Sequence, residues 1–205
     1  MSRRRTFGDA GQAFPVYITV VGGLLFLAFA YLAVGQAAAN RNGAQTAADA
    51  AALAAAQDTR DQLAGMWLDD VRDPAKWQDI LDGNVPGLGP SCWRADELAA
   101  QNDAHVEACT PTDPLGYTVD VETDKPVGDS IVPGTEDKYA KASATAVIES
   151  RCTFDLPGED AGDGDGNEVL PLPQLSCEDR NWDPDPEDPS TLPDPEDLFD
   201  VHLAD

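Results

Sequence analysis

The sequence predicts an α+β protein that is carried on one long N-terminal helix. Three observations lead to this fold class. No charged residue lies between Ala10 and Asn40. Apolar and polar residues then alternate at Tyr117–Glu122 and again at Ala142–Ile148, as they do in half-buried strands. Finally, all four cysteines follow the uncharged stretch. Together these features predict a membrane helix followed by a small, disulfide-stapled domain with a short antiparallel sheet.

The apolar core of the uncharged stretch is long enough to cross a bilayer. Val16–Val34 would span ~28 Å as a helix, close to the hydrocarbon thickness of a membrane. Pro15 suits the first turn of a helix, where its missing N–H leaves no bond unmade. We therefore predict a short leader over residues 1–13 and a transmembrane helix over residues 14–39, with the lipid bilayer as its first partner.

The charges beside this helix predict its direction. Arg3, Arg4 and Arg5 precede it, whereas acidic residues dominate after it. Basic residues stay preferentially on the cytoplasmic side. The expected localisation is therefore the cell membrane, single-pass, with the N-terminus cytoplasmic and the C-terminal domain extracytoplasmic.

A cleaved signal peptide is the alternative interpretation of the same stretch. Ala37-Ala38-Ala39 satisfies the small-residue rule for a cleavage site, and cleavage there would release a secreted acidic protein. The apolar region of a signal peptide usually has about 7 to 15 residues. Because this one is longer and continues into alanine-rich sequence, a retained anchor is the preferred interpretation.

Residues 40–72 are expected to continue the helix beyond the membrane. Gln45–Gln57 is alanine-rich, and alanine is the strongest helix former. Asn40–Gly43 permits a kink at the membrane surface. The alanine run has few charges for a solvated helix, and its narrow surface lets another helix or a sheet come close. The residues expected to pack are Ala47, Ala48, Ala51, Leu53, Ala54 and Ala55.

Residues 73–177 are expected to form the extracytoplasmic α+β domain. Asp73-Pro74 is typical of a helix start and predicts a short helix ending at Leu81. A second short helix is predicted over residues 94–108. The two strands would then pair through the loop at residues 127–138. Because so small a sheet needs a helix on one face, the extracellular part of the long helix is the obvious cover.

The cysteines predict two disulfide bonds. An even number on the extracytoplasmic side indicates oxidation, and four cysteines allow three pairings. Proximity in the sequence favours Cys92–Cys109 and Cys152–Cys177. No two cysteines have the close spacing of a zinc site, so a metal role is disfavoured.

The C-terminal part is strongly acidic. Residues 151–205 contain 17 acidic and two basic residues, out of a formal net charge of −25 for the chain. Such a chain repels nucleic acid, which excludes nucleic-acid binding. Residues 178–205 are rich in proline and acid, so we predict a disordered tail. Leu198, Phe199, Val201 and Leu203 form a small apolar cluster within it.

Catalytic motifs are absent from the sequence. The two histidines are His105, on a predicted surface helix, and His202, in the predicted tail, so no Ser/His/Asp set can be assembled. Asp163, Asp165 and Asn167 resemble the start of a calcium loop, but Glu168 and Gln174 stand where glycine and glutamate are needed. We therefore predict no catalytic residue, no cofactor and no metal site, and no enzyme activity.

The N-terminal third resembles the TadG-like segment of Tad (Flp-type) pilus-assembly proteins. The resemblance covers residues 8–57 and rests on Gly11-Gln12-Ala13, on Phe14-Pro15 opening the apolar stretch, and on the run from Gln45 to Ala56. It implies a non-catalytic envelope component of a Tad-type pilus or secretion system. It also implies kinship with pilin-like subunits, whose N-terminal helices pack together.

The resemblance implies partners among the other Tad/Flp components, with a possible homo- or hetero-oligomer formed through the N-terminal helix. A pilin cleaved after Gly11 would carry glutamate at its fifth residue, where this chain has Val16; a retained anchor fits better. The alternative from a different class is an anchored cell-wall-binding module that uses exposed tryptophans. The candidates are Trp67, Trp77, Trp93 and Trp182.

Overall fold

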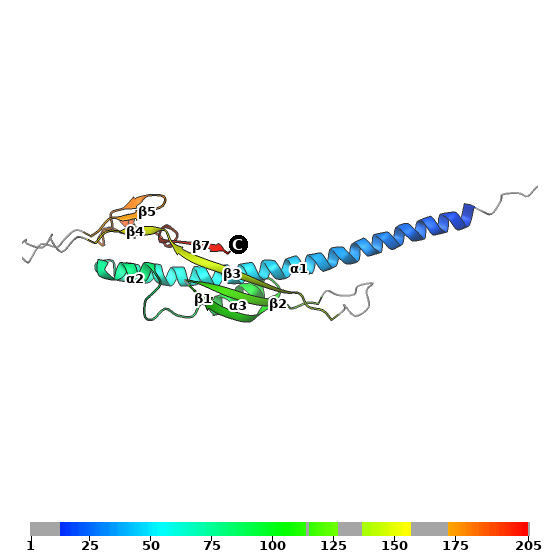
Figure 1. The fold of residues 1–205 in the computed structure, drawn as a ribbon, viewed down its shortest axis with the longest axis horizontal. Helices are drawn as coiled ribbons and strands as arrows, with labels where there is room; N and C mark the ends of the chain where they lie inside the picture. The colour runs from blue at the N-terminus through cyan, green and yellow to red at the C-terminus, as the bar shows by residue number, and fades with distance from the viewer. Residues whose placement is uncertain (1–12, 114, 127–136, 157–171, 205) are drawn as a thin grey trace, which may run out of the picture.

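The computed structural model describes residues 13–113, 115–126, 137–156 and 172–204. Helix α1 (Ala13–Asp69) runs along most of the length of the molecule, and its C-terminal half is surrounded by the other elements (Figure 1). The elements that follow it, in chain order, are η1 (Pro74–Lys76), α2 (Trp77–Leu81), α3 (Cys92–Gln101), β1 (Ala104–Thr112), β2 (Gly116–Thr123), β3 (Lys141–Ser150), β4 (Cys152–Phe154), β5 (Leu175–Cys177), β6 (Asn181–Trp182), η3 (Pro189–Thr191), α4 (Pro195–Leu198) and β7 (Phe199–Leu203).

Helix α1 is continuous over its 57 residues. It passes through Asn40–Gly43 without a break, so the local weakness of these residues does not end it. At the standard helical rise its length is ~85 Å. The predicted long N-terminal helix is confirmed.

The main sheet has four antiparallel strands in the order β1-β2-β3-β7. Strands β2 and β3 are the two predicted strands, and they pair with Val119 opposite Ala144. Their alternate residues face α1: Val119, Val121 and Ala146 are fully buried. The small antiparallel sheet covered by the long helix is therefore confirmed.

Small side chains on both layers let helix and sheet approach closely. Ala144 and Ala146 of β3 are buried on the face that meets α1, where Ala48 and Ala51 are also buried. Alanine buries little apolar area by itself, so the layers are held by many close contacts instead. This explains why the alanine run lies inside the domain.

Aromatic residues pack around the C-terminal end of α1. Trp77 of α2 lies 5.1 Å from Trp67 of α1 and 5.2 Å from Phe154 of β4, measured between ring centroids. Strands β4, β5 and β6 form a second, three-stranded sheet beside them. The predicted short helix at residues 74–81 is present as η1 and α2, although the Asp73 side chain makes no capping hydrogen bond.

The predicted helix over residues 94–108 is wrong in its second half. Helix α3 ends at Gln101, and the chain turns at Asp103, whose φ is +54°. Residues 104–112 then form edge strand β1, which pairs with β2 along its length. Alanine and glutamate favour a helix locally, but pairing with β2 and the Cys92–Cys109 bond hold this segment extended.

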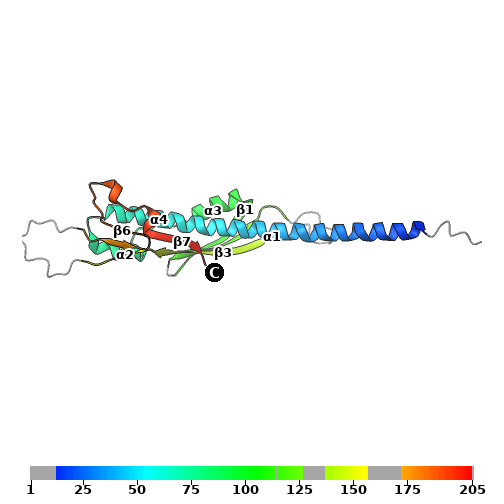
Figure 2. The same cartoon turned by 90° about the horizontal axis from the view of Figure 1, so that it is seen from above.

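The predicted disorder of residues 178–205 is also wrong for the part that the structure describes. Residues 178–204 cross over α1 and end in β7, which adds to the edge of β3 (Figure 2). Two prolines of this segment occupy the first turns of η3 and α4, where proline is favoured. Leu198 and Phe199 are buried, so the apolar cluster anchors the segment on the core.

Candidate functional site

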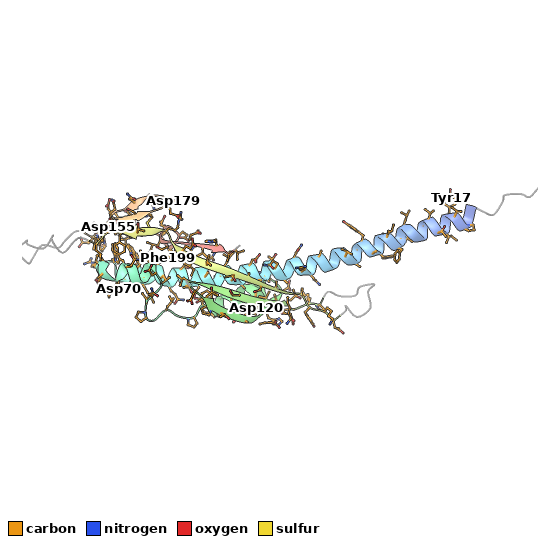
Figure 3. All side chains as sticks on the ribbon, viewed as in Figure 1. Tyr17, Asp70, Asp120, Asp155, Asp179 and Phe199 are labelled. Atoms are coloured by element: carbon orange, nitrogen blue, oxygen red, sulfur yellow. A yellow bond between two sulfur atoms is a disulfide. The ribbon has the colours of Figure 1, made fainter. Side chains whose placement is uncertain are left out.

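The N-terminal half of α1 presents an exposed apolar surface. It projects away from the domain, and its side chains point outward on all sides (Figure 3). Its large hydrophobic residues between Val16 and Val34 are 52–81% exposed. By length and composition this helix can cross a membrane. A surface of this size on one element needs a bilayer or protein partners to cover it.

Glycines make this half of α1 suitable for close packing. Apart from the adjacent residues and the helix's own backbone, a methyl group added at Gly22, Gly23 or Gly35 would meet no atom within 4 Å. These positions are therefore open on the monomer. In membranes, small residues are where helices approach each other most closely.

The residues predicted to pack in the alanine run are covered by the protein's own domain. Helix α1 packs against β3, α3, β2 and β7. Leu53 is half-buried at the border of this face. The others are buried, namely Ala47, Ala48, Ala51, Ala54 and Ala55. Partners must accordingly be met by other surfaces of the folded chain.

A buried polar cluster fixes the position of α1 relative to the domain. Thr59 on α1 donates a hydrogen bond to the Tyr117 hydroxyl at 3.0 Å, and its oxygen lies 2.7 Å from that of Ser91. Gln62, one turn further, reaches Ser91 and accepts a hydrogen bond from the Gly89 backbone N–H. A shift of α1 by one residue along the sheet would break these hydrogen bonds. It is disfavoured because a buried hydroxyl without a partner is costly.

Two disulfides hold the domain together. The bond Cys92–Cys109 ties α3 to β1, and the bond Cys152–Cys177 ties β4 to β5. Both pairs are the ones that sequence proximity favours. The first bond therefore joins a helix to a strand, not the two ends of one helix as the predicted element boundaries implied.

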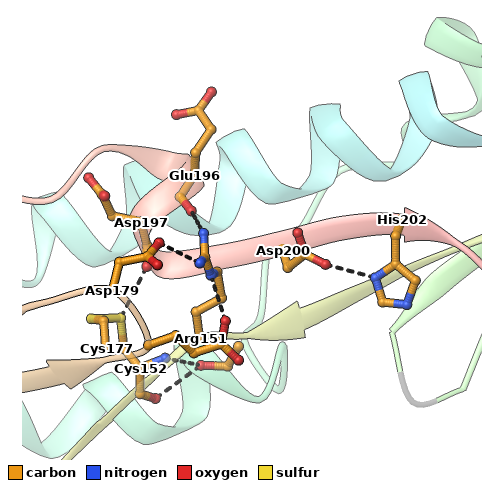
Figure 4. A network of polar contacts seen from close by, with 10 residues as sticks. Arg151, Cys152, Cys177, Asp179, Glu196, Asp197, Asp200 and His202 are labelled. Atoms are coloured by element: carbon orange, nitrogen blue, oxygen red, sulfur yellow. Dashed lines mark hydrogen bonds and ion pairs between the residues drawn. A yellow bond between two sulfur atoms is a disulfide. The ribbon is translucent and has the colours of Figure 1, made fainter.

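Arg151 fixes the C-terminal segment beside the second disulfide (Figure 4). Its guanidinium donates hydrogen bonds to Glu178 at 3.1 Å, to Asp179 at 2.6 Å and to the backbone carbonyl of Glu196 at 3.0 Å. The hydrogen bond to Glu178, aided by Asp179, raises the pKa of Arg151 above its ordinary value. The guanidinium stays charged, so its part in this contact does not depend on pH.

One group of metal-type ligands lies close together among the described residues. It comprises His105 and Glu107 of β1 and Glu122 of β2, on an exposed part of the sheet. The Lys141 ammonium already occupies this group, 2.7 Å from Glu107 and 3.0 Å from Glu122. Hydrogen bonds to Glu107 and then Glu122 raise the pKa of Lys141. The group is thus an ion-paired surface cluster.

Within the part of the chain that the structure describes, the remaining sequence candidates do not come together as a reactive site. His105 lies on β1, not on a helix, with its Nδ1 2.9 Å from the Asp124 carboxylate; His202 lies on β7 with its Nδ1 2.8 Å from the Asp200 carboxylate. Asp188 caps η3, and hydrogen bonds from the Ser190 hydroxyl and backbone lower its pKa. The calcium-like stretch at residues 163–168 lies outside the described residues.

Three of the four tryptophans serve packing. Trp67, Trp77 and Trp182 are buried, and only Trp93 on α3 is exposed. A carbohydrate-binding platform normally presents several exposed aromatic rings. The described structure therefore gives little support to the cell-wall-binding alternative.

Comparison with known families gives one match. Residues 11–58 match the family model described as "Putative Flp pilus-assembly TadE/G-like". The resemblance drawn from the sequence is thereby confirmed over this segment. The matched segment comprises the N-terminal half of α1 with its exposed apolar residues 16–34, called the bare half below, and the whole of the alanine run at residues 45–57. No curated protein and no solved structure matches the chain.

Proposed function

We propose that this protein is a non-catalytic, single-span envelope component of a Tad/Flp-type pilus-assembly or secretion system. The observation that carries the proposal is the coincidence of the family match with the bare, apolar half of α1. This half lies in the bilayer and makes contact with other components there. The domain at the other end of the same helix is presented outside the cytoplasm.

Several features support this orientation. Arg3, Arg4 and Arg5 precede the apolar stretch, as the positive-inside rule requires for a cytoplasmic N-terminus. Both disulfides belong to the C-terminal domain, and disulfides persist in oxidising compartments outside the cytoplasm. The uninterrupted helix across Ala39 favours a retained anchor over cleavage at that residue.

Charged residues in the bare half of α1 test membrane insertion. We expect Leu25→Arg with Leu27→Arg to move most of the protein out of the carbonate-resistant membrane fraction, because each arginine near the bilayer centre costs about 3 kcal/mol. The matched control, Leu25→Ala with Leu27→Ala, should remain membrane-bound.

N-terminal mass spectrometry of the native protein completes the test: a chain that starts at Asn40 would contradict the anchor, and a start at Gln12 would indicate pilin-type processing.

Bulky residues at the open glycines test partner contact separately from folding. We expect Gly22→Leu with Gly23→Leu to reduce co-purification with Tad-type membrane proteins by about tenfold, because close helix contact is lost. Apart from the adjacent residues and the helix's own backbone, no described atom lies within 4 Å of a Cβ at these positions, so the domain should unfold at an unchanged temperature. The control, Val20→Leu with Val21→Leu, changes two neighbouring residues that are already large and leaves both glycines in place. Equal co-purification of both variants would argue against contact through these glycines.

A further inference from the structure

A groove with an apolar floor and an acidic rim lies on the domain, away from the bare half of α1. Its volume is about 610 Å³. Three of its lining residues are apolar and form what we call the floor: Leu81 at the end of α2 and Ile148 of β3 are buried, and Leu115 before β2 is half-buried. Three exposed carboxylates also line it and form what we call the rim: Asp82 just after α2, Asp113 just after β1 and Glu149 of β3.

The turn after α2 shapes this groove. Gly83 has a φ of +72°, and a methyl group added there would come within 2.9 Å of the Leu115 side chain. Leu115 also accepts a backbone hydrogen bond from Ile148 through its carbonyl, at 2.9 Å. The floor residues are therefore held by the backbone of two elements, so the groove is largely formed before any partner arrives.

The acidic rim is not neutralised by the chain itself. Among the described residues, none of the three carboxylates has an ion-pair partner, and Asp82 accepts hydrogen bonds only from the neutral Gln78 amide. Glu149 also stands directly opposite Asp200 in the pairing of β3 with β7. Like charges in directly opposed positions destabilise a strand pair. A cation placed at this rim would relieve that repulsion.

We propose that the groove binds an arginine side chain from a basic segment of a partner protein. The aliphatic stem of arginine would cover Leu81, Leu115 and Ile148, while the guanidinium would meet the rim carboxylates. A guanidinium has five donors spread over a plane, which suits carboxylates that come from separate segments of the chain. In a chain with a formal net charge of −25, such a partner is also favoured at long range.

A bound metal ion fits this groove less well. A metal needs ligand oxygens that converge, and the rim carboxylates do not form a group whose oxygens all lie within 4.8 Å of one another in the described structure. The apolar floor would contribute nothing to a hydrated ion. The proposal concerns a different surface from the membrane helix and can fail or hold independently of the pilus role.

The test uses the full chain in zwitterionic detergent micelles, with labelled Leu and Ile methyl groups followed by NMR. The probe is the capped peptide Ac-Gly-Ala-Arg-Ala-Gly-NH2. We expect it to shift the methyl resonances of Leu81, Leu115 and Ile148. The same peptide with citrulline, which has nearly the same shape but no charge, should bind at least about tenfold more weakly. The peptide with 2-amino-3-guanidinopropionic acid, whose stem is short, should also bind more weakly.

A charge-matched pair of variants separates the groove from general attraction to an acidic protein. Asp82→Asn, Asp113→Asn and Glu149→Gln combined should weaken binding by about tenfold. The control variant combines Asp69→Asn, Asp96→Asn and Asp120→Asn, which removes the same charge from exposed positions elsewhere and should bind as the unmodified chain does. Equal weakening in both variants would overturn the proposal. Equal binding of the citrulline peptide, or the same methyl shifts with Ca²⁺ alone, would also overturn it.

Discussion

Replacing Ala51 by aspartate is expected to unfold the extracytoplasmic domain. Ala51 is fully buried, and it faces the sheet from the middle of the buried alanine run. A carboxylate there would be buried without a partner, which costs roughly 3–5 kcal/mol, and its extra volume would push helix and sheet apart. Since domains are stable by about 5–15 kcal/mol, this is a large part of the total. Thermal unfolding of the full chain, followed by near-ultraviolet circular dichroism in micelles, measures the effect.

The control for this experiment places the same charge on the same helix in water. Gln57 is exposed on α1, so Gln57→Asp should change the free energy of unfolding by no more than about 0.5 kcal/mol. The pair also distinguishes two roles of the alanine run. If partner helices covered Ala51 instead of the protein's own sheet, Ala51→Asp would reduce co-purification and leave the unfolding of the isolated chain unchanged.

Replacing Phe199 by alanine should be nearly as damaging. Phe199 begins β7, is 1% exposed, and lies beside Leu198, which is also buried. Removing a buried phenylalanine side chain typically costs about 3–5 kcal/mol, because the contacts are lost and a cavity remains. We expect the melting temperature of the full chain to fall by several degrees, with increased hydrogen exchange in β7 and β3.

An exposed residue of the same strand provides the control. His202→Ala changes an exposed residue of β7 and should leave the unfolding free energy within about 0.5 kcal/mol of the original. A C-terminal segment that was disordered in solution would make the two substitutions equally harmless. That result would contradict the strand pairing of residues 199–203.

Much of the fold follows from patterns that are local in the sequence. The uncharged stretch and the alanine run extend α1 from Ala13 to Asp69, because helix propensity and length are properties of consecutive residues. The alternation around Val119 and Ala144 marks β2 and β3, because side chains of a strand alternate between its faces. The closeness of each cysteine to its partner in the chain suggested both disulfides.

The elements that were mispredicted depend on partners distant in the sequence. Strand β1 contains His105, Glu107 and Ala108, which have no strong strand propensity. It is extended because its backbone forms hydrogen bonds with β2. Strand β7 follows a proline- and acid-rich stretch, and the only hint of it was the small apolar cluster from Leu198 to Leu203. The role of that cluster depended on whether a core lay within reach.

For the candidate sites, the same division holds. The sequence by itself determined that one apolar helix needs a bilayer or partners, because its composition leaves no polar face to turn toward water. Only the tertiary structure decided that the alanine run is covered by the protein's own sheet, and that Asp82, Asp113 and Glu149 line one groove. The physical reason is that contacts between segments distant in the sequence decide which residues are buried and which charged residues become neighbours. A local sequence pattern does not specify those contacts.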